Sequence, residues 1–260
     1  MKTLIIGTPR TRTSFILNTI CSFYKAKNYF ELYTEEQVYV RDYCVRQKGS
    51  SPKEFSVYYN QRLQQIKQKI FFNDKFGIKI FPTHFYNSLQ IHNQHTRLID
   101  ESFKESIFKN ISDLFHINLY DNIYLLHRYN LTDIILSYVL SKKSMVFRYT
   151  TPLDFKRDPL KIENFSVTDA DYALIDSLIM CHLLIDNIEQ YLTKYSLPYT
   201  KLEYSQIPAY AEKNYPNVDS GILENKFNYR EIAPNYNEVN DYVEKRKLEL
   251  YNISKDIEFY

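Results

Sequence analysis

Residues 3–15 read TLIIGTPRTRTSF, an apolar run followed at once by a loop rich in hydroxyl groups and arginine. The run predicts a buried strand from Thr3 to Ile6, and the pattern after the loop predicts a helix from Thr13 to Tyr24. A strand that enters a helix through a short loop is a building unit of α/β proteins. The start of the chain therefore indicates an α/β fold.

The rest of the chain repeats this alternation of short apolar strands and helical patterns. Further strands are predicted at 29–32, 76–81, 122–127 and 199–202, and helices at 35–47, 52–71, 101–115, 131–141, 169–195 and 237–253. Ser166 followed by Asp169 predicts the cap of the long helix that ends near Tyr195. We expect a single domain over residues 1–260, with a mainly parallel central sheet flanked by helices.

Charge and composition exclude several classes of protein. The chain has 33 basic and 31 acidic residues and a formal net charge of +2, which argues against a nucleic-acid partner. No apolar run approaches the roughly 20 residues that a membrane-spanning helix needs. The cysteines Cys21, Cys44 and Cys181 are odd in number and lack CxxC spacing, as in a reducing compartment. These features predict a cytoplasmic protein without a transmembrane segment.

The loop between the first strand and helix has the composition of an anion site. Backbone N–H groups at a helix N-terminus favour a phosphate or sulfate. Hydroxyl groups add hydrogen-bond donors, and an arginine adds a permanent charge. The expected ligands are Pro9, Arg10, Thr11, Arg12, Thr13 and Ser14. The loop lacks the GxxxxGK[ST] pattern of nucleoside triphosphatases.

A second candidate site follows the strand at 122–127. Arg128 stands at the carboxyl end of that strand, where open α/β sheets place their ligands, and Ser137 lies on the next helix. Both side chains are close enough along the chain to bind one anionic group. In the alternative interpretation, Arg128 pairs with Asp133 and Ser137 only packs.

Together, these two motifs resemble the sulfotransferases that use 3′-phosphoadenosine 5′-phosphosulfate (PAPS). The segment from Pro9 to Phe15 is similar to the loop that binds the 5′-phosphosulfate in that family, and Arg128 with Ser137 to the pair that binds the 3′-phosphate. Weaker similarity extends to 76–80 and 202–205. The resemblance implies a P-loop NTPase-like sulfotransferase fold and transfer of a sulfuryl group to a hydroxyl of a small-molecule, sugar or glycolipid acceptor.

The resemblance also implies roles for particular residues. Arg10 occupies the position of the family's catalytic lysine or arginine, so it is expected to stabilise charge on the leaving phosphate. Arg12 stands where the family usually has glycine. If that position requires a positive φ, the arginine costs on the order of 1–2 kcal/mol there. Alternatively, Arg12 contacts the donor or the acceptor.

Two residues are candidates for the base that takes the acceptor's proton. Glu31 follows the first helix, in a segment similar to one that supplies a catalytic glutamate in bacterial members of the family. His84 follows the strand that contains Lys79, in a segment similar to the KTH motif of cytosolic members. We favour Glu31 over His84. Lys79 is a candidate contact to the donor or acceptor, or a solvated residue at the strand's edge.

The remaining histidines give no indication of a metal site. His92 and His95 form an HxxH in a polar stretch, and His182 on the long helix is expected to pack. We therefore predict no catalytic metal. Two other functions stay open: a nucleotide-dependent small-molecule kinase, and a non-catalytic module that binds a nucleotide or glycan on the same scaffold.

Overall fold

The sheet stands at the centre of the molecule. The computed structural model describes residues 1–29, 74–82, 120–144, 165–218 and 228–255, together with Gln61, Gln65 and Gln68. In these residues five parallel strands form one sheet in the order β2-β3-β1-β4-β5. Their bounds are β1 Lys2–Gly7, β2 Lys27–Asn28, β3 Phe76–Ile80, β4 Asn122–His127 and β5 Thr200–Glu203. The predicted α/β class with a parallel central sheet is confirmed.

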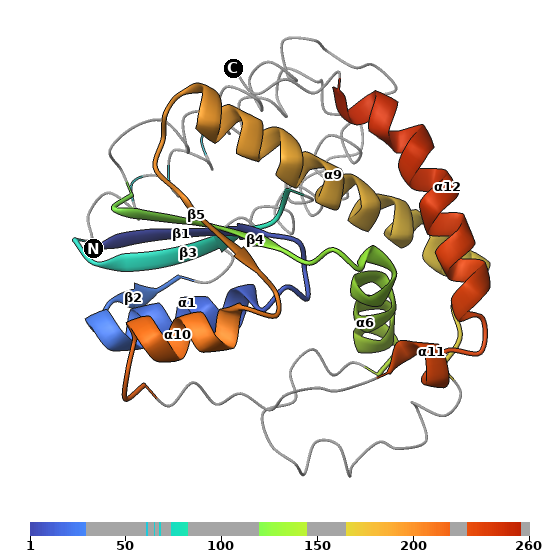
Figure 1. The fold of residues 1–260 in the computed structure, drawn as a ribbon, viewed down its shortest axis with the longest axis horizontal. Coiled ribbons are helices and arrows are strands. Elements are labelled where there is room, and N and C mark those ends of the chain that lie inside the picture. The colour runs from blue at the N-terminus through green and yellow to red at the C-terminus, as the bar shows by residue number, and fades with distance from the viewer. Residues whose placement is uncertain are drawn as a thin grey trace.

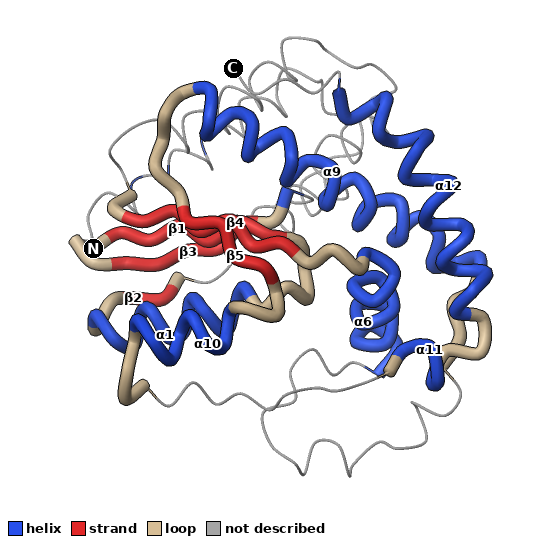
Figure 2. Tube along the Cα trace, in the orientation of Figure 1, coloured by secondary structure: helices blue, strands red, loops and turns tan. Residues whose placement is uncertain are grey.

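Helices cover both faces of this sheet, as Figures 1 and 2 show. The helices α1 (Thr13–Tyr24) and α10 (Ile207–Asn214) lie on one face, and α9 (Tyr172–Lys194) lies on the other. Helix α12 (Tyr236–Lys255) packs along α9. Beyond the carboxyl ends of the strands lie α6 (Leu131–Ser144) and α11 (Tyr229–Ile232). No helix in the described residues is both long and apolar enough to cross a bilayer.

The alternation of side chains along the strands decides which residues face which helices. Ile5, Tyr124 and Leu126 belong to the buried cluster that contains the apolar residues of α1 and α10. Because successive side chains of a strand point to opposite faces, Leu125 and His127 point to the face that α9 covers. His127 therefore leaves the sheet on the side away from α1.

A second apolar core joins the helices beyond the sheet. It contains buried residues of α6, α9, α11 and α12, among them Ile135, Ile179, Tyr229 and Val243. Asn130 starts α6, because its side-chain oxygen accepts a hydrogen bond of 3.0 Å from the backbone N–H of Asp133. This packing holds α6 at the carboxyl end of the sheet.

Several boundaries differ from the predictions. The long helix is preceded by a 3-10 turn, η1 (Asp169–Asp171), and its capping box is Thr168 with Asp171 rather than Ser166 with Asp169. The second strand is at Lys27–Asn28, before the predicted 29–32. Helices α10 and α11 were not predicted. The helices predicted at 35–47 and 101–115 lie outside the described residues, as does most of the one at 52–71.

Candidate anion-binding site

The loop after β1 folds back closely over the end of its own strand. A Cβ atom added to Gly7 would lie 2.8 Å from Thr11 Oγ1 and 2.9 Å from Thr13 Cγ2, so a glycine is required there. Thr11 is fully buried and donates its hydroxyl proton to the carbonyl of Thr8 at 2.6 Å. Thr11 was predicted to donate to an anion, but in this structure its hydroxyl closes the loop. Pro9 is buried in the same turn.

The backbone of this loop has an unusual conformation at two arginines. Arg10 has φ 68° and Arg12 has φ 60°, both in the left-handed region that favours glycine. Arg12 therefore has the positive φ that was considered for this position, where the family that the loop resembles usually has glycine. Left-handed residues in a loop that precedes a helix are a common feature of backbone anion sites.

Helix α1 begins without a side-chain cap from its N-cap residue. That residue is Arg12, and it makes no capping hydrogen bond. Arginine has no acceptor atom, so it cannot satisfy the first N–H groups of the helix. Ser14, in the first turn, accepts a hydrogen bond of 2.5 Å from the buried Nζ of Lys79 on β3. The cation of Lys79 is thus held beside the positive end of α1.

The structure brings the two sequence motifs together. Arg10 Nε donates a hydrogen bond of 2.9 Å to Oγ of Ser137, which is buried on α6. Nη1 of Arg128, at the end of β4, lies 3.5 Å from the carbonyl oxygen of Arg10. Residues 127 positions apart in the chain are therefore in direct contact.

Arg128 also forms an ion pair with Asp133, as the alternative interpretation of the sequence predicted. Its Nη2 atom lies 3.5 Å from Oδ2 of Asp133. Burial raises the pKa of Asp133, and Arg128 opposes that shift only in part. A guanidinium has five N–H donors, so these two contacts of 3.5 Å leave Arg128 able to bind an anion as well. The ion pair and the anion site are compatible.

Two tyrosines that the sequence did not single out complete the site. The ring of Tyr204 lies next to the guanidinium groups of both Arg12 and Arg128, with Cζ atoms 4.2 and 4.4 Å from its centroid. Such contacts contribute about 0.5–1 kcal/mol each at exposed positions. Tyr229 of α11 is buried and hydrogen-bonds Ser137; burial raises the pKa of its hydroxyl.

We call the four cationic residues of this site the cationic cluster. They are Arg10, Arg12, Lys79 and Arg128. They follow or end the neighbouring strands β1, β3 and β4, at the carboxyl edge where open α/β sheets bind ligands. Like charges brought together beside a helix N-terminus favour a ligand with more than one negative group. This arrangement suits a phosphorylated or sulfated compound.

The two candidate bases are not part of this description. Glu31 and His84 both lie outside the described residues. The six loop residues from Pro9 to Ser14, together with Arg128 and Ser137, are all described, and they lie in one continuous region. Thr13 is buried at the first position of α1.

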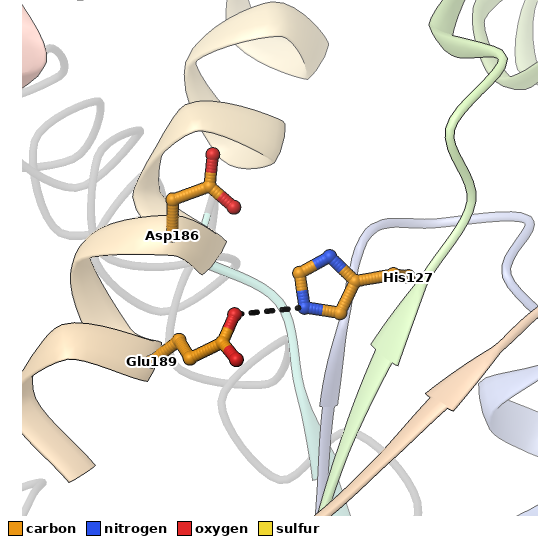
Figure 3. A group of neighbouring side chains, drawn as sticks. All are labelled: His127, Asp186 and Glu189. Atoms are coloured by element: carbon orange, nitrogen blue, oxygen red, sulfur yellow. Dashed lines mark ion pairs between the residues drawn. The ribbon is translucent and has the colours of Figure 1, made fainter. Parts of the chain in front are cut away.

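A separate group of side chains lies on the other face of the sheet. His127 points from the end of β4 toward Asp186 and Glu189 of α9 (Figure 3). Burial lowers the pKa of His127, and Lys201 contributes to the same direction. The imidazole is therefore held in its neutral form at neutral pH. The sequence did not single out this group, since its members come from segments read separately.

Comparison with known proteins adds no family to this description. The chain matches no model of a known protein family, and no curated protein is significantly similar to it.

The left-handed backbone at Arg12 leads to a prediction about stability. Arg12→Gly is expected to be about 1 kcal/mol more stable than Arg12→Ala, because both lose the guanidinium but only glycine adopts φ 60° without cost. Chemical denaturation of the two variants measures the difference. Equal stability would show that the loop relaxes to another conformation when the arginine is removed.

Proposed function

We propose that the protein is a sulfotransferase that transfers the sulfuryl group of PAPS to a hydroxyl of a small-molecule, sugar or glycolipid acceptor. The contact between Arg10 and Ser137 supports this most directly, at 2.9 Å from Nε to Oγ. It joins the loop that resembles a 5′-phosphosulfate site to the pair that resembles a 3′-phosphate site. A donor with anionic groups at the 3′ and 5′ positions of one ribose fits two such motifs in contact.

The proposed reaction is an in-line displacement at sulfur. The acceptor oxygen forms a bond to sulfur while the bond from sulfur to the 5′-phosphate oxygen breaks. The electron pair of that bond leaves with adenosine 3′,5′-bisphosphate, and the acceptor's proton passes to a base. Chemistry of this kind needs cations at the leaving phosphate and no metal ion.

The residues of the site have distinct roles in this proposal. The N–H groups at the start of α1, with Ser14 and Lys79, hold the 5′-phosphosulfate. Arg128 and Ser137 hold the 3′-phosphate. Arg10, which contacts Ser137 and whose carbonyl lies near Arg128, stabilises the leaving phosphate as a fixed charge. Arginine stays protonated and so acts only electrostatically.

Tyr204 gives Arg12 a place in this arrangement. Arg12 Nη1 lies 3.3 Å from the Tyr204 carbonyl oxygen, and the guanidinium packs on the Tyr204 ring. Its charge is thereby held at the edge of the loop, on the same tyrosine that Arg128 contacts. In this position the charge of Arg12 contributes to the electrostatic attraction of the donor. Arg12 therefore has a role of its own at the position where the family usually has glycine.

A comparison of nucleotides tests the proposal. Adenosine 3′,5′-bisphosphate should raise the thermal stability, by roughly 2.7 kcal/mol at a 100-fold excess over its Kd, and AMP should do so far less. The difference arises because AMP lacks the 3′-phosphate that Arg128 and Ser137 would bind. Differential scanning fluorimetry provides the measurement, with Arg128→Ala as the variant in which the two nucleotides should become similar.

The same experiment includes the alternative functions. Equal shifts with the bisphosphate and with AMP in the unmodified protein would contradict the donor assignment. A shift that requires ATP together with magnesium, followed by ATP turnover, would indicate a kinase. Bisphosphate binding without transfer from PAPS to any hydroxyl acceptor would indicate a binding module.

A further inference from the structure

The group formed by His127, Asp186 and Glu189 has the composition of a metal site. One ligand atom from each residue lies within 4.8 Å of the other two. The two carboxylates are three positions apart on α9, so they lie on the same side of the helix and face β4 (Figure 3). Two rigid elements therefore present three ligand atoms to one point.

The His127 side chain has a buried nitrogen that lacks a hydrogen-bond partner within the described parts of the chain. It is only 5% exposed, and among the described residues its Nε2 atom has no hydrogen-bond partner. The nearest carboxylate oxygen, Oε2 of Glu189, is 3.7 Å away, which is longer than a hydrogen bond. Buried polar atoms in proteins nearly always have a partner. A ligand between the imidazole and the carboxylates would provide one.

The charges around the group favour a cation. Glu189 accepts hydrogen bonds from Lys201 Nζ at 3.0 Å (Oε1) and 2.8 Å (Oε2). The Lys201 ammonium contacts Glu189 only, so within the described part of the chain the carboxylate of Asp186 has no hydrogen-bonded cation of its own, although Lys201 and Lys247 both act on it at longer range. One imidazole nitrogen with two carboxylate oxygens is a ligand set of zinc and related transition metals, whereas magnesium and calcium prefer oxygen alone.

We propose that His127, Asp186 and Glu189 bind a divalent transition-metal ion such as Zn²⁺. The ion ties α9 to the end of β4, directly behind Arg128 of the cationic cluster. Its role is structural, because none of its ligands belongs to that cluster. The Lys201 ammonium competes with the ion for the Glu189 carboxylate. The affinity for the metal therefore depends on how far Lys201 Nζ moves away from that carboxylate when the ion binds. The site is independent of the proposed sulfotransferase activity.

A titration of the metal-free protein with Co²⁺ and Zn²⁺ tests this site. We expect one equivalent of Co²⁺ to bind with a visible absorption band and to be displaced by Zn²⁺. Asp186→Asn should weaken binding at least ~10-fold, since loss even of residues that only orient a ligand costs that much. Asp186 is exposed, so this variant is expected to fold; His127→Gln should have the larger effect. Lys201→Gln should tighten binding by removing the competing ammonium.

Two matched controls separate this site from other histidines. His182→Gln, one turn earlier on α9, should leave the affinity unchanged, and so should the double variant His92→Gln/His95→Gln. The proposal is overturned if neither metal binds at millimolar concentration, if Asp186→Asn and His127→Gln bind as the unmodified protein does, or if the HxxH variant abolishes binding. Circular dichroism of each variant shows that it is folded.

Discussion

Replacing Arg10 with alanine is expected to lower turnover by about 10²–10³-fold, with a much smaller loss of donor affinity. The reason is that negative charge on the leaving phosphate grows only as the bond to sulfur breaks. A cation placed there acts mainly on the transition state, so its removal lowers kcat rather than raising Kd. Arg10→Ala keeps a non-glycine residue at φ 68°, which leaves the backbone cost unchanged. Turnover is measured with an acceptor found by screening alcohols, sugars and glycolipids.

Arg128→Ala is the matched comparison for this result. Arg128 is proposed to hold the 3′-phosphate in both the ground state and the transition state. Its loss should weaken bisphosphate binding by roughly ten- to hundredfold, if 1.5–3 kcal/mol of charge-assisted hydrogen bonding is removed. If Arg10→Ala behaved in the same way and changed affinity alone, its catalytic role would have to be withdrawn. Arg10 would then be a second ligand of the 3′-phosphate, as its contact with Ser137 would permit.

The accuracy of the fold prediction follows from the strength of the local patterns. The strand at Asn122–His127 and the helix at Thr13–Tyr24 were predicted with their observed bounds. In each, the apolar residues form a run or a helical period that has one structural interpretation. Short polar elements lack that signal. Helix α10 contains Pro208 in its first turn and only two buried residues, Ile207 and Ala211, so its pattern did not stand out.

The cap of the long helix shows a different limit. Ser166, Thr168, Asp169 and Asp171 can all serve as partners in a capping box, and sequence alone does not choose among them. Tertiary contacts decide, because Lys143 Nζ lies 2.8 Å from Asp171 Oδ2 and Asn235 hydrogen-bonds the backbone of Val167. These partners come from α6 and from the segment before α12. The observed start of the helix therefore depends on segments far away in the chain.

The site was predictable where the sheet's topology determines it. Loops that follow adjacent parallel strands meet at one edge, so the approach of Arg128 to the β1–α1 loop follows from the strand order. The contact of Arg12 with Tyr204 spans 192 residues and depends on the turn after β5, for which the sequence had no periodic signal. The contact of Tyr229 with Ser137 and the group around His127 also join segments that are far apart in the chain. Neither Tyr229 nor any member of that group belongs to a recognisable sequence motif, and only the packing of the helices brings these residues to their partners.

The largest effect of all is expected from the base that takes the acceptor's proton. Loss of a general base lowers turnover by roughly 10²–10⁴-fold. The bisphosphate should still bind, because the base acts on the acceptor hydroxyl and not on the donor. Glu31→Gln and His84→Gln keep the size of each side chain approximately and remove its basicity. We expect Glu31→Gln to lose turnover and His84→Gln to keep it. Bisphosphate affinity of both variants, measured by calorimetry, is the control for folding.

The pH dependence of turnover gives an independent measurement of the same choice. A free histidine titrates near pH 6.5, whereas a free glutamate titrates near 4.3, so the acid limb of the profile differs between the two bases. Near-full activity of Glu31→Gln would reject Glu31, and a collapse in His84→Gln would assign the role to His84. If both variants stayed active, the base would be neither residue, and the proton would leave through water or from an acceptor that is already acidic. In that case Arg10 and Lys79 would have to supply the whole catalytic effect by charge alone, and the Arg10→Ala variant would show a correspondingly greater loss.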